Sequence, residues 1–243
     1  MRVTGHDRSK AVTRQPAQSF DAFAETYDRL VSLSAGFVRS YIESVLPETG
    51  RRAADLGCGT GLHASILATR FEEVLAVDIS SPMLEIACVR RARPNIRYEL
   101  RDLRDVSPER DGRFDLVFSA STLHHVPDLD DALQRIRGLL APGGRVVLLD
   151  NVSSTPAVPR WWFRREALRR FVGDVLGRRR PLREAIEVLR LQTHPAWLDH
   201  VTTDRFLSPS EFRQRYGGIF PGGQFTDLYR TCVLTWQAEV SPT

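Results

Sequence analysis

Between residues 53 and 150, short apolar segments alternate with amphipathic ones, and no other feature of the sequence limits the possible folds as much. Apolar strands joined through helices are typical of a parallel sheet that is covered on both faces. The alternation therefore predicts an α/β fold with a Rossmann-like, doubly wound and mostly parallel sheet. The expected strands are 53–56, 73–77, 96–100, 114–119 and 145–150, and the expected helices between them are 62–70, 81–91 and 129–140.

The segments on either side of this alternation extend the same fold. Ser19 and Ser34 can each cap a short helix before the first strand, because apolar residues follow both serines at helical spacing. Residues 224–237 alternate like two strands joined by a tight turn near 229–230. Together with the five central strands they predict a seven-stranded sheet whose last strand is antiparallel.

The chain divides into three parts on this pattern. Residues 1–18 are polar and aperiodic, and we expect a disordered tail there. Residues 19–240 form one domain, within which 151–207 breaks the alternation and predicts a helical insertion on the acceptor side. This insertion is rich in aromatic residues, which either form a lid over an acceptor or pack within the insertion itself. The residues concerned are Trp161, Trp162, Phe163, Trp197 and Phe206.

Composition excludes several classes of protein. The 243 residues, 42% of them apolar, can bury a core without disulfides. The three cysteines are far apart in the sequence and form no C-x-x-C motif, so no metal site is expected. We expect a cytoplasmic protein without a membrane partner, because no apolar run is long enough to span a bilayer. The net charge is +4, and Lys10 is the single lysine among the basic residues, the others being arginines. This preference for arginine indicates a bias in the base composition of the genome more than a nucleic-acid partner. The role of the arginine-rich segment 164–180 and the choice between monomer and homodimer stay open.

A glycine-rich turn, Asp55-Leu56-Gly57-Cys58-Gly59-Thr60-Gly61, follows the first expected strand. Glycines at such a turn allow a sharp bend and let a ligand approach the backbone, although a tight turn without a ligand has the same composition. A dinucleotide site would have G-x-G-x-x-G spacing, whereas this turn has G-x-G-x-G, which disfavours a nucleotide-dependent oxidoreductase. Asp55 would repel a pyrophosphate but suits an ammonium group, such as that of S-adenosylmethionine.

Acidic residues at the next two strand ends suit the rest of that cofactor. Asp78 can accept hydrogen bonds from both ribose hydroxyls, and Asp102 can accept one from the adenine amino group. Ile79, Met83 and Leu103 can cover the two faces of the base, although each also lies where a core side chain is expected.

These segments together resemble the class I S-adenosylmethionine-dependent methyltransferases. The resemblance covers about 20–152 and, more weakly, 208–237. It implies that Gly57, Gly59, Asp78, Asp102 and Ser119 contact the cofactor. The Tyr27-Asp28 pair looks like the element that folds over the methionine end, where the Tyr27 hydroxyl can reach the carboxylate, with helix packing as the alternative. The motifs are FDAFAETYDRL, ADLGCGTG, VLAVDISSPML, RDLRD, FDLVFSASTLHHVPD and LLAPGGRVVLLD.

The expected function is transfer of a methyl group to a small organic acceptor, a hydroxyl in natural-product biosynthesis, with S-adenosylhomocysteine as the product. The compact insertion favours this over N- or C-methylation of a peptide or other acceptor, methylation of an RNA, or cofactor binding without catalysis. Resemblance to natural-product O-methyltransferases, together with topology, assigns the catalytic roles to His124 and Asp150. His124, rather than His125, is expected to face the transfer site, with Asp150 as its orienting partner.

Overall fold

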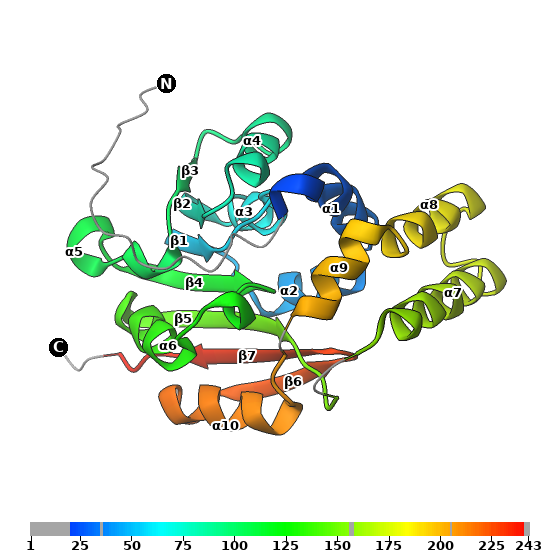
Figure 1. Ribbon diagram of the computed structural model, residues 1–243. Helices are drawn as coiled ribbons and strands as arrows, with labels where there is room; N and C mark the ends of the chain where they lie inside the picture. Colours follow the sequence, from blue (N-terminus) through cyan, green and yellow to red (C-terminus); the bar gives the residue numbers. More distant parts are fainter. Residues whose placement is uncertain (1–19, 35, 156–157, 205, 241–243) are drawn as a thin grey trace, which may run out of the picture.

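A seven-stranded sheet forms the centre of the computed structural model, which describes residues 20–34, 36–155, 158–204 and 206–240 (Figure 1). The strand order is β3-β2-β1-β4-β5-β7-β6, with β7 antiparallel to both of its neighbours and the other pairs parallel. The predicted fold class is confirmed. The tail expected over 1–18 lies outside the described residues. The strands are β1 (Gly50–Leu56), β2 (Phe71–Asp78), β3 (Ile96–Leu100), β4 (Phe114–Ala120), β5 (Leu140–Asn151), β6 (Gln224–Leu228) and β7 (Thr231–Gln237).

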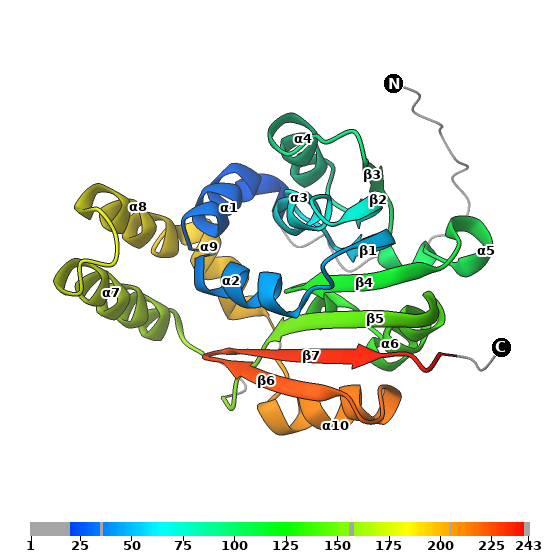
Figure 2. The same cartoon turned by 180° about the vertical axis from the view of Figure 1, so that it is seen from behind.

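Helices cover both faces of this sheet (Figure 2). Alternate residues of β5 point to opposite faces, so Val146 packs with α6 and α10, whereas Val147 packs with α2, α3 and α4. Among the described helices, none is long and apolar enough to cross a membrane. The α-helices are α1 (Phe20–Ser34), α2 (Gly36–Val45), α3 (Leu62–Leu67), α4 (Ser81–Arg90), α5 (Pro108–Asp111), α6 (Leu129–Gly138), α7 (Arg160–Leu176), α8 (Leu182–Gln192), α9 (Pro195–Thr203) and α10 (Pro209–Ile219), and the 3₁₀ turns are η1 (Leu103–Asp105) and η2 (Leu123–His125).

Two local features differ from the sequence prediction. Helix α6 ends at Gly138 and β5 begins at Leu140, so the Pro142-Gly143-Gly144 stretch lies within the strand. There the register with β4 is irregular, and Gly143 has φ of 74°, a backbone conformation that glycine adopts without strain. Helix α1 is kinked at Phe23, whose φ is −138°. A sequence pattern shows apolar spacing but not such breaks in regularity.

The segment that interrupts the alternation contains α7, α8 and α9, which lie beyond the carboxyl ends of the parallel strands (Figure 1). The chain leaves the sheet at Val152 and returns at Leu207, and these two residues form a parallel bridge. Arg29 of α1 donates to both carboxylate oxygens of Glu187 on α8, at 2.5 and 2.9 Å. Helix α1 and this segment thus share the same edge of the sheet.

Candidate functional site

The strand order reverses between β1 and β4, and at this point the carboxyl ends of an open α/β sheet form a crevice. The glycine turn follows β1, η2 follows β4, and Asp150 lies near the end of β5. Most of the residues that the sequence singles out therefore gather at one edge of the sheet, under α1 and α9.

The three glycines of the turn all have left-handed backbone, but for different reasons. A Cβ on Gly57 would lie 2.2 Å from a side-chain atom of Thr122, and one on Gly61 would lie 2.5 Å from the Tyr98 hydroxyl. Packing therefore requires both of these glycines. At Gly59 the nearest atom, on the Tyr27 ring, is 3.9 Å away, so the backbone is open there. Gly59 is the position where a ligand can approach the main chain.

Asp55 and Asp78 lie beside this open backbone. Asp55 is buried, and burial followed by the charge of Asp78 raises its pKa to about 8. Its Oδ2 has no hydrogen-bond partner among the described residues, and a buried polar atom of this kind calls for a ligand. Asp78 accepts hydrogen bonds from the backbone N–H groups of Gly59 (2.7 Å) and Ser80 (2.9 Å), one on each oxygen. A carboxylate held in this way is an acceptor that a ligand's hydroxyl groups can approach.

Tyr27 closes the space above the turn from the side of α1. Its ring lies 6.4 Å from that of Trp197 on α9, so the two helices meet there. Burial, followed by the charges of Asp78 and Asp204, raises the pKa of Tyr27 to about 12. The hydroxyl therefore stays protonated and can donate. The neighbouring Asp28 points away, because it forms ion pairs with Arg90 and Arg91 that hold α1 to the end of α4.

The residues expected around the adenine base differ in how exposed they are and in what they contact. Ile79 is 63% exposed at the edge of the site. Asp102 lies two residues beyond the end of β3, caps η1 and forms an ion pair with Arg104 at 2.6 Å. Leu103 is partly buried against the core.

Met83 and Ser119 are more deeply buried than the other expected cofactor residues. Met83 is 2% exposed and packs with Ala24 and Ile86 between α1 and α4. Ser119 is fully buried, and its hydroxyl donates to the carbonyl oxygen of Leu56 at 2.7 Å, which joins β4 to β1. Both side chains contribute to packing between elements, and their contact with the cofactor stays a prediction.

His124 and Asp150 are brought together as expected from topology. The ring Nδ1 of His124 lies 2.5 Å from Asp150 Oδ1, and its backbone N–H donates to Oδ2 at 2.9 Å. Because a carboxylate only accepts, Nδ1 carries the proton and Nε2 faces the other way. Burial lowers the pKa of His124, but the charge and hydrogen bond of Asp150, followed by Asp204, outweigh it and raise the pKa.

Asp204 and His200, which the sequence interpretation did not assign, lie near His124 together with His125. Asp204 Oδ2 is 3.8 Å from His124 Nε2 and 3.6 Å from His200 Nε2, and its Oδ1 is 3.9 Å from His125 Nδ1. Burial and then His124 lower the pKa values of His125, to about 2, and of His200, to about 4, so both rings are neutral. Asp204 and His200 belong to the α9 region, which has no motif, and only folding brings them here.

This cluster also has the spacing of a metal site. His124, His125 and Asp204 each offer one ligand atom, and these atoms lie within 4.8 Å of one another. Imidazole and carboxylate ligands suit Zn²⁺ and related ions. An ion held by Nε2 of His124 would occupy the nitrogen that faces away from Asp150.

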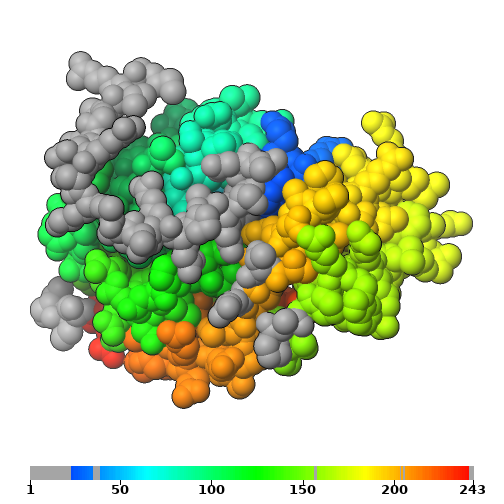
Figure 3. Space-filling view, in the orientation of Figure 1, coloured from blue at the N-terminus to red at the C-terminus, as the bar shows by residue number. Residues whose placement is uncertain are grey.

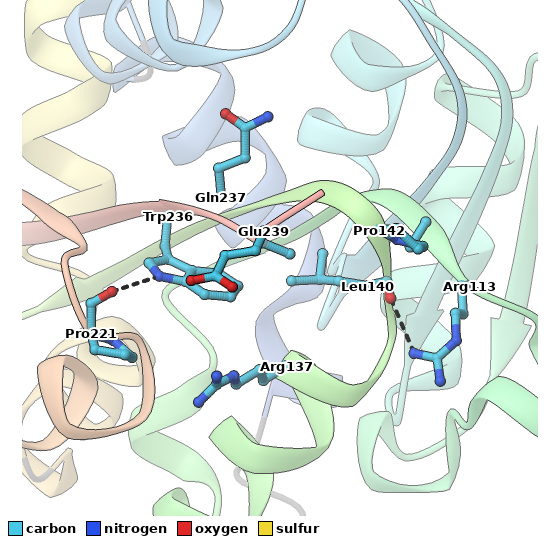
Figure 4. A pocket seen from close by; sticks show the side chains of 10 residues that line it. Arg113, Arg137, Leu140, Pro142, Pro221, Trp236, Gln237 and Glu239 are labelled. Atoms are coloured by element: carbon cyan, nitrogen blue, oxygen red, sulfur yellow. Dashed lines mark hydrogen bonds between the residues drawn. The ribbon is translucent and has the colours of Figure 1, made fainter. Parts of the chain in front are cut away.

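A separate groove lies at the opposite edge of the sheet, where β5 begins and β7 ends (Figure 4). The guanidinium of Arg137 lies 5.4 Å from the centre of the Trp236 ring, and the Trp236 N–H donates to the carbonyl of Pro221. The lining contains none of the candidate site residues, so the carboxyl edge remains the candidate site.

Residues 54–148 match a family model described as a methyltransferase domain. These residues are therefore similar to a methyltransferase domain. The sheet order, with its antiparallel last strand, agrees with the class I fold that the sequence motifs resemble. The matched residues contain the glycine turn, Asp78, Asp102 and the His124-His125 pair, which are the residues that carried the resemblance in the sequence.

Individual relatives share this methyltransferase domain but not their full length with the chain. An uncharacterized methyltransferase of Mycobacterium tuberculosis is 38% identical over 112 residues, which are 46% of this chain and 56% of the relative. A ubiquinone biosynthesis O-methyltransferase of Xanthomonas axonopodis pv. citri is 30% identical over 119 residues, 48% of this chain and 49% of the relative. The chain thus spans about half the length of these curated relatives.

Similarity of fold extends further than similarity of sequence. The solved structure of a DhpI–S-adenosylhomocysteine complex covers 92% of this chain, and this chain covers 95% of it, with a TM-score of 0.63 and 21% identity. The fold of that structure therefore includes counterparts of segments outside residues 54–148.

Proposed function

We propose that this chain transfers the methyl group of S-adenosylmethionine to a hydroxyl of a small organic acceptor at the carboxyl edge of the sheet. The observation that carries the proposal is the buried His124–Asp150 pair, 2.5 Å apart beside the glycine turn. A base is needed when the nucleophile must lose a proton, as an alcohol must. The partial similarity to an O-methyltransferase of ubiquinone biosynthesis also favours oxygen as the accepting atom.

The residues around the glycine turn fit the proposed cofactor. The unpartnered Oδ2 of Asp55 suits its ammonium group, and the protonated Tyr27 hydroxyl suits its carboxylate. The carboxylate of Asp78, next to the open backbone at Gly59, suits the ribose hydroxyls as a hydrogen-bond acceptor. When bound, S-adenosylmethionine supplies an electrophilic methyl group on a sulfonium.

His124 and Asp150 would then act on the acceptor. Nε2 takes the proton of the acceptor hydroxyl while the acceptor oxygen attacks, and Asp150 stabilises the imidazolium that forms. A positioned base of this kind contributes roughly 10²–10⁴-fold to the rate. Burial of the pair excludes water, which strengthens the electrostatic effect of Asp150.

The surroundings of His124 favour a small acceptor with an aromatic or apolar body. The ring of Phe206 lies 4.9 Å from that of His124, and Trp197 packs near His200 with ring centres 5.7 Å apart. A compact site lined in this way suits an intermediate of natural-product biosynthesis better than a peptide or an RNA.

An amine is the second candidate acceptor. Asp150 and Asp204 are both buried beside His124, and two carboxylates there would also attract a cationic acceptor. A free amine needs no base, so the two acceptors make different demands on His124.

The test is a product assay with purified protein, S-adenosylmethionine and a panel of phenols, alcohols and amines. We expect S-adenosylhomocysteine and a methyl ether to form together with at least one hydroxyl acceptor. Methylation of amines alone would contradict the oxygen assignment, and binding of the cofactor without turnover across the panel would favour a non-catalytic binding protein.

A further inference from the structure

The outward face of α7 carries a row of exposed apolar side chains. Trp161, Leu168, Val172 and Leu176 are 61%, 53%, 44% and 79% exposed. At about 100° per residue these four positions lie within about 80° of one another, so they form one stripe along the helix. The α7–α8 hairpin projects from the body of the molecule (Figures 1 and 3). Exposed apolar side chains gathered on one face are typical of a site that is covered on binding.

Arginines accompany this stripe and are available for an anionic partner. Arg164 lies beside the stripe on the exposed surface of α7, and Arg165 lies within it between Trp161 and Leu168. Arg178 and Arg179 follow the helix at the tip of the hairpin. These four have no carboxylate partner within the described part of the chain. The ion pairs of the segment use Arg160, Arg169, Arg170 and Arg180 instead.

We propose that this face of α7 binds the surface of an anionic lipid membrane. The apolar stripe enters the boundary between headgroups and acyl chains, and the arginines pair with lipid phosphates, as in a helix that lies in the membrane interface. The expectation of no membrane partner was based on the lack of a spanning segment, and peripheral binding needs none. This inference goes beyond the proposed methyl transfer and does not depend on it.

The positive charge of this face favours an anionic membrane over a second copy of the chain as its partner. Two copies meeting through their stripes would bring Arg164 and Arg165 of each into one interface, where like charges repel strongly because water is excluded. An RNA would engage the arginines but would leave Leu168 and Val172 exposed. An anionic membrane engages both kinds of side chain.

The experiment is vesicle flotation of the full chain, with phosphatidylcholine vesicles compared with mixed phosphatidylcholine and phosphatidylglycerol vesicles. We expect binding to the anionic vesicles that weakens as salt is added. The double variants Leu168→Asn with Val172→Asn, and Arg164→Gln with Arg165→Gln, should each weaken vesicle binding by roughly tenfold or more. Val89→Asn, which changes an 83% exposed residue of α4, should bind like the wild type.

Fluorescence provides a second readout that needs only mild substitutions. Anionic vesicles should shift the tryptophan emission to shorter wavelength, and Trp161→Phe should remove this shift while Trp236→Phe keeps it. The proposal is wrong if the chain fails to float with anionic vesicles, or if the stripe variants bind as well as the wild type. Absence of vesicle binding together with a dimer that Leu168→Asn dissociates in sedimentation would indicate a second copy of the chain instead. Absence of vesicle binding together with RNA binding that only the arginine variant loses would indicate an RNA instead.

Discussion

At the scale of single residues, the arrangement around His124 makes the most direct prediction. His124→Ala should lower turnover of a hydroxyl acceptor by roughly 10²–10⁴-fold, because Nε2 can no longer take the proton. The dissociation constant for S-adenosylhomocysteine should stay nearly unchanged, since the residues proposed to hold the cofactor, Tyr27, Asp55 and Asp78, are kept. Steady-state kinetics and calorimetry measure the two quantities.

The neighbouring histidine is the matched control for this variant. His125→Ala removes a partly buried neutral ring from the same turn and leaves His124 and Asp150 themselves unchanged, although the two rings lie 3.8 Å apart. If His125→Ala loses turnover while His124→Ala keeps it, the catalytic assignment is wrong. Normal turnover in both variants would favour an amine or a carbon nucleophile.

The buried carboxyl of Asp55 links stability to pH. Its pKa is raised from 3.8 to about 8 in the folded protein. Between these two pH values the folded protein keeps the Asp55 proton, whereas the unfolded chain has released it. Stability without cofactor should therefore fall as pH rises from about 4 to about 8 and change little with this group above that range. Thermal unfolding over this pH range should show a flatter profile for Asp55→Asn. A profile that this substitution leaves unchanged would show that another group dominates.

The metal-ligand spacing at His124 leads to a prediction on metal ions. Zn²⁺ should inhibit methyl transfer by occupying Nε2 of His124, and a chelator should leave the turnover of the purified protein unchanged. His125→Ala should reduce this inhibition, because it removes one of the three ligands. Loss of activity with the chelator and its return with a divalent ion would instead indicate metal-assisted transfer.

At the scale of elements, two glycines of the turn between β1 and α3 should affect different properties, one mainly the stability of the fold and the other mainly cofactor binding. Gly57→Ala and Gly59→Ala both place a side chain on left-handed backbone, with φ of 75° and 51°, at a cost of order 1–3 kcal/mol each. Gly57→Ala additionally meets Thr122 at 2.2 Å, so it should lower the melting temperature more.

In cofactor binding, measured per folded molecule, the order of the two variants should be reversed: Gly59→Ala should be affected more than Gly57→Ala. Gly59→Ala places its Cβ in the open space beside Tyr27 and should weaken S-adenosylhomocysteine binding, which calorimetry on the folded variant measures. If Gly59→Ala binds as tightly as the wild type, the ligand does not approach the backbone there.

At the scale of the whole molecule, the sequence predicts the sheet well because the alternation of apolar segments depends on burial, which any such sheet requires. It predicts less about where a side chain at a strand end points. Ser119 joins β4 to β1 and Met83 packs under α1, and the sequence pattern shows neither of these contacts. Asp204 and His200 could not be found, because their approach to His124 depends on the path of α9.

The bridge between Val152 and Leu207 has a consequence for how such a chain can diverge. Because departure and return occur at neighbouring points, the intervening helices can lengthen, shorten or be replaced over generations without changing the strands to which they are attached. The turn after β1 remains under separate selection. Under the proposed function, descendants of one ancestral sequence would acquire new acceptors through one stretch of gene while their donor chemistry stays the same.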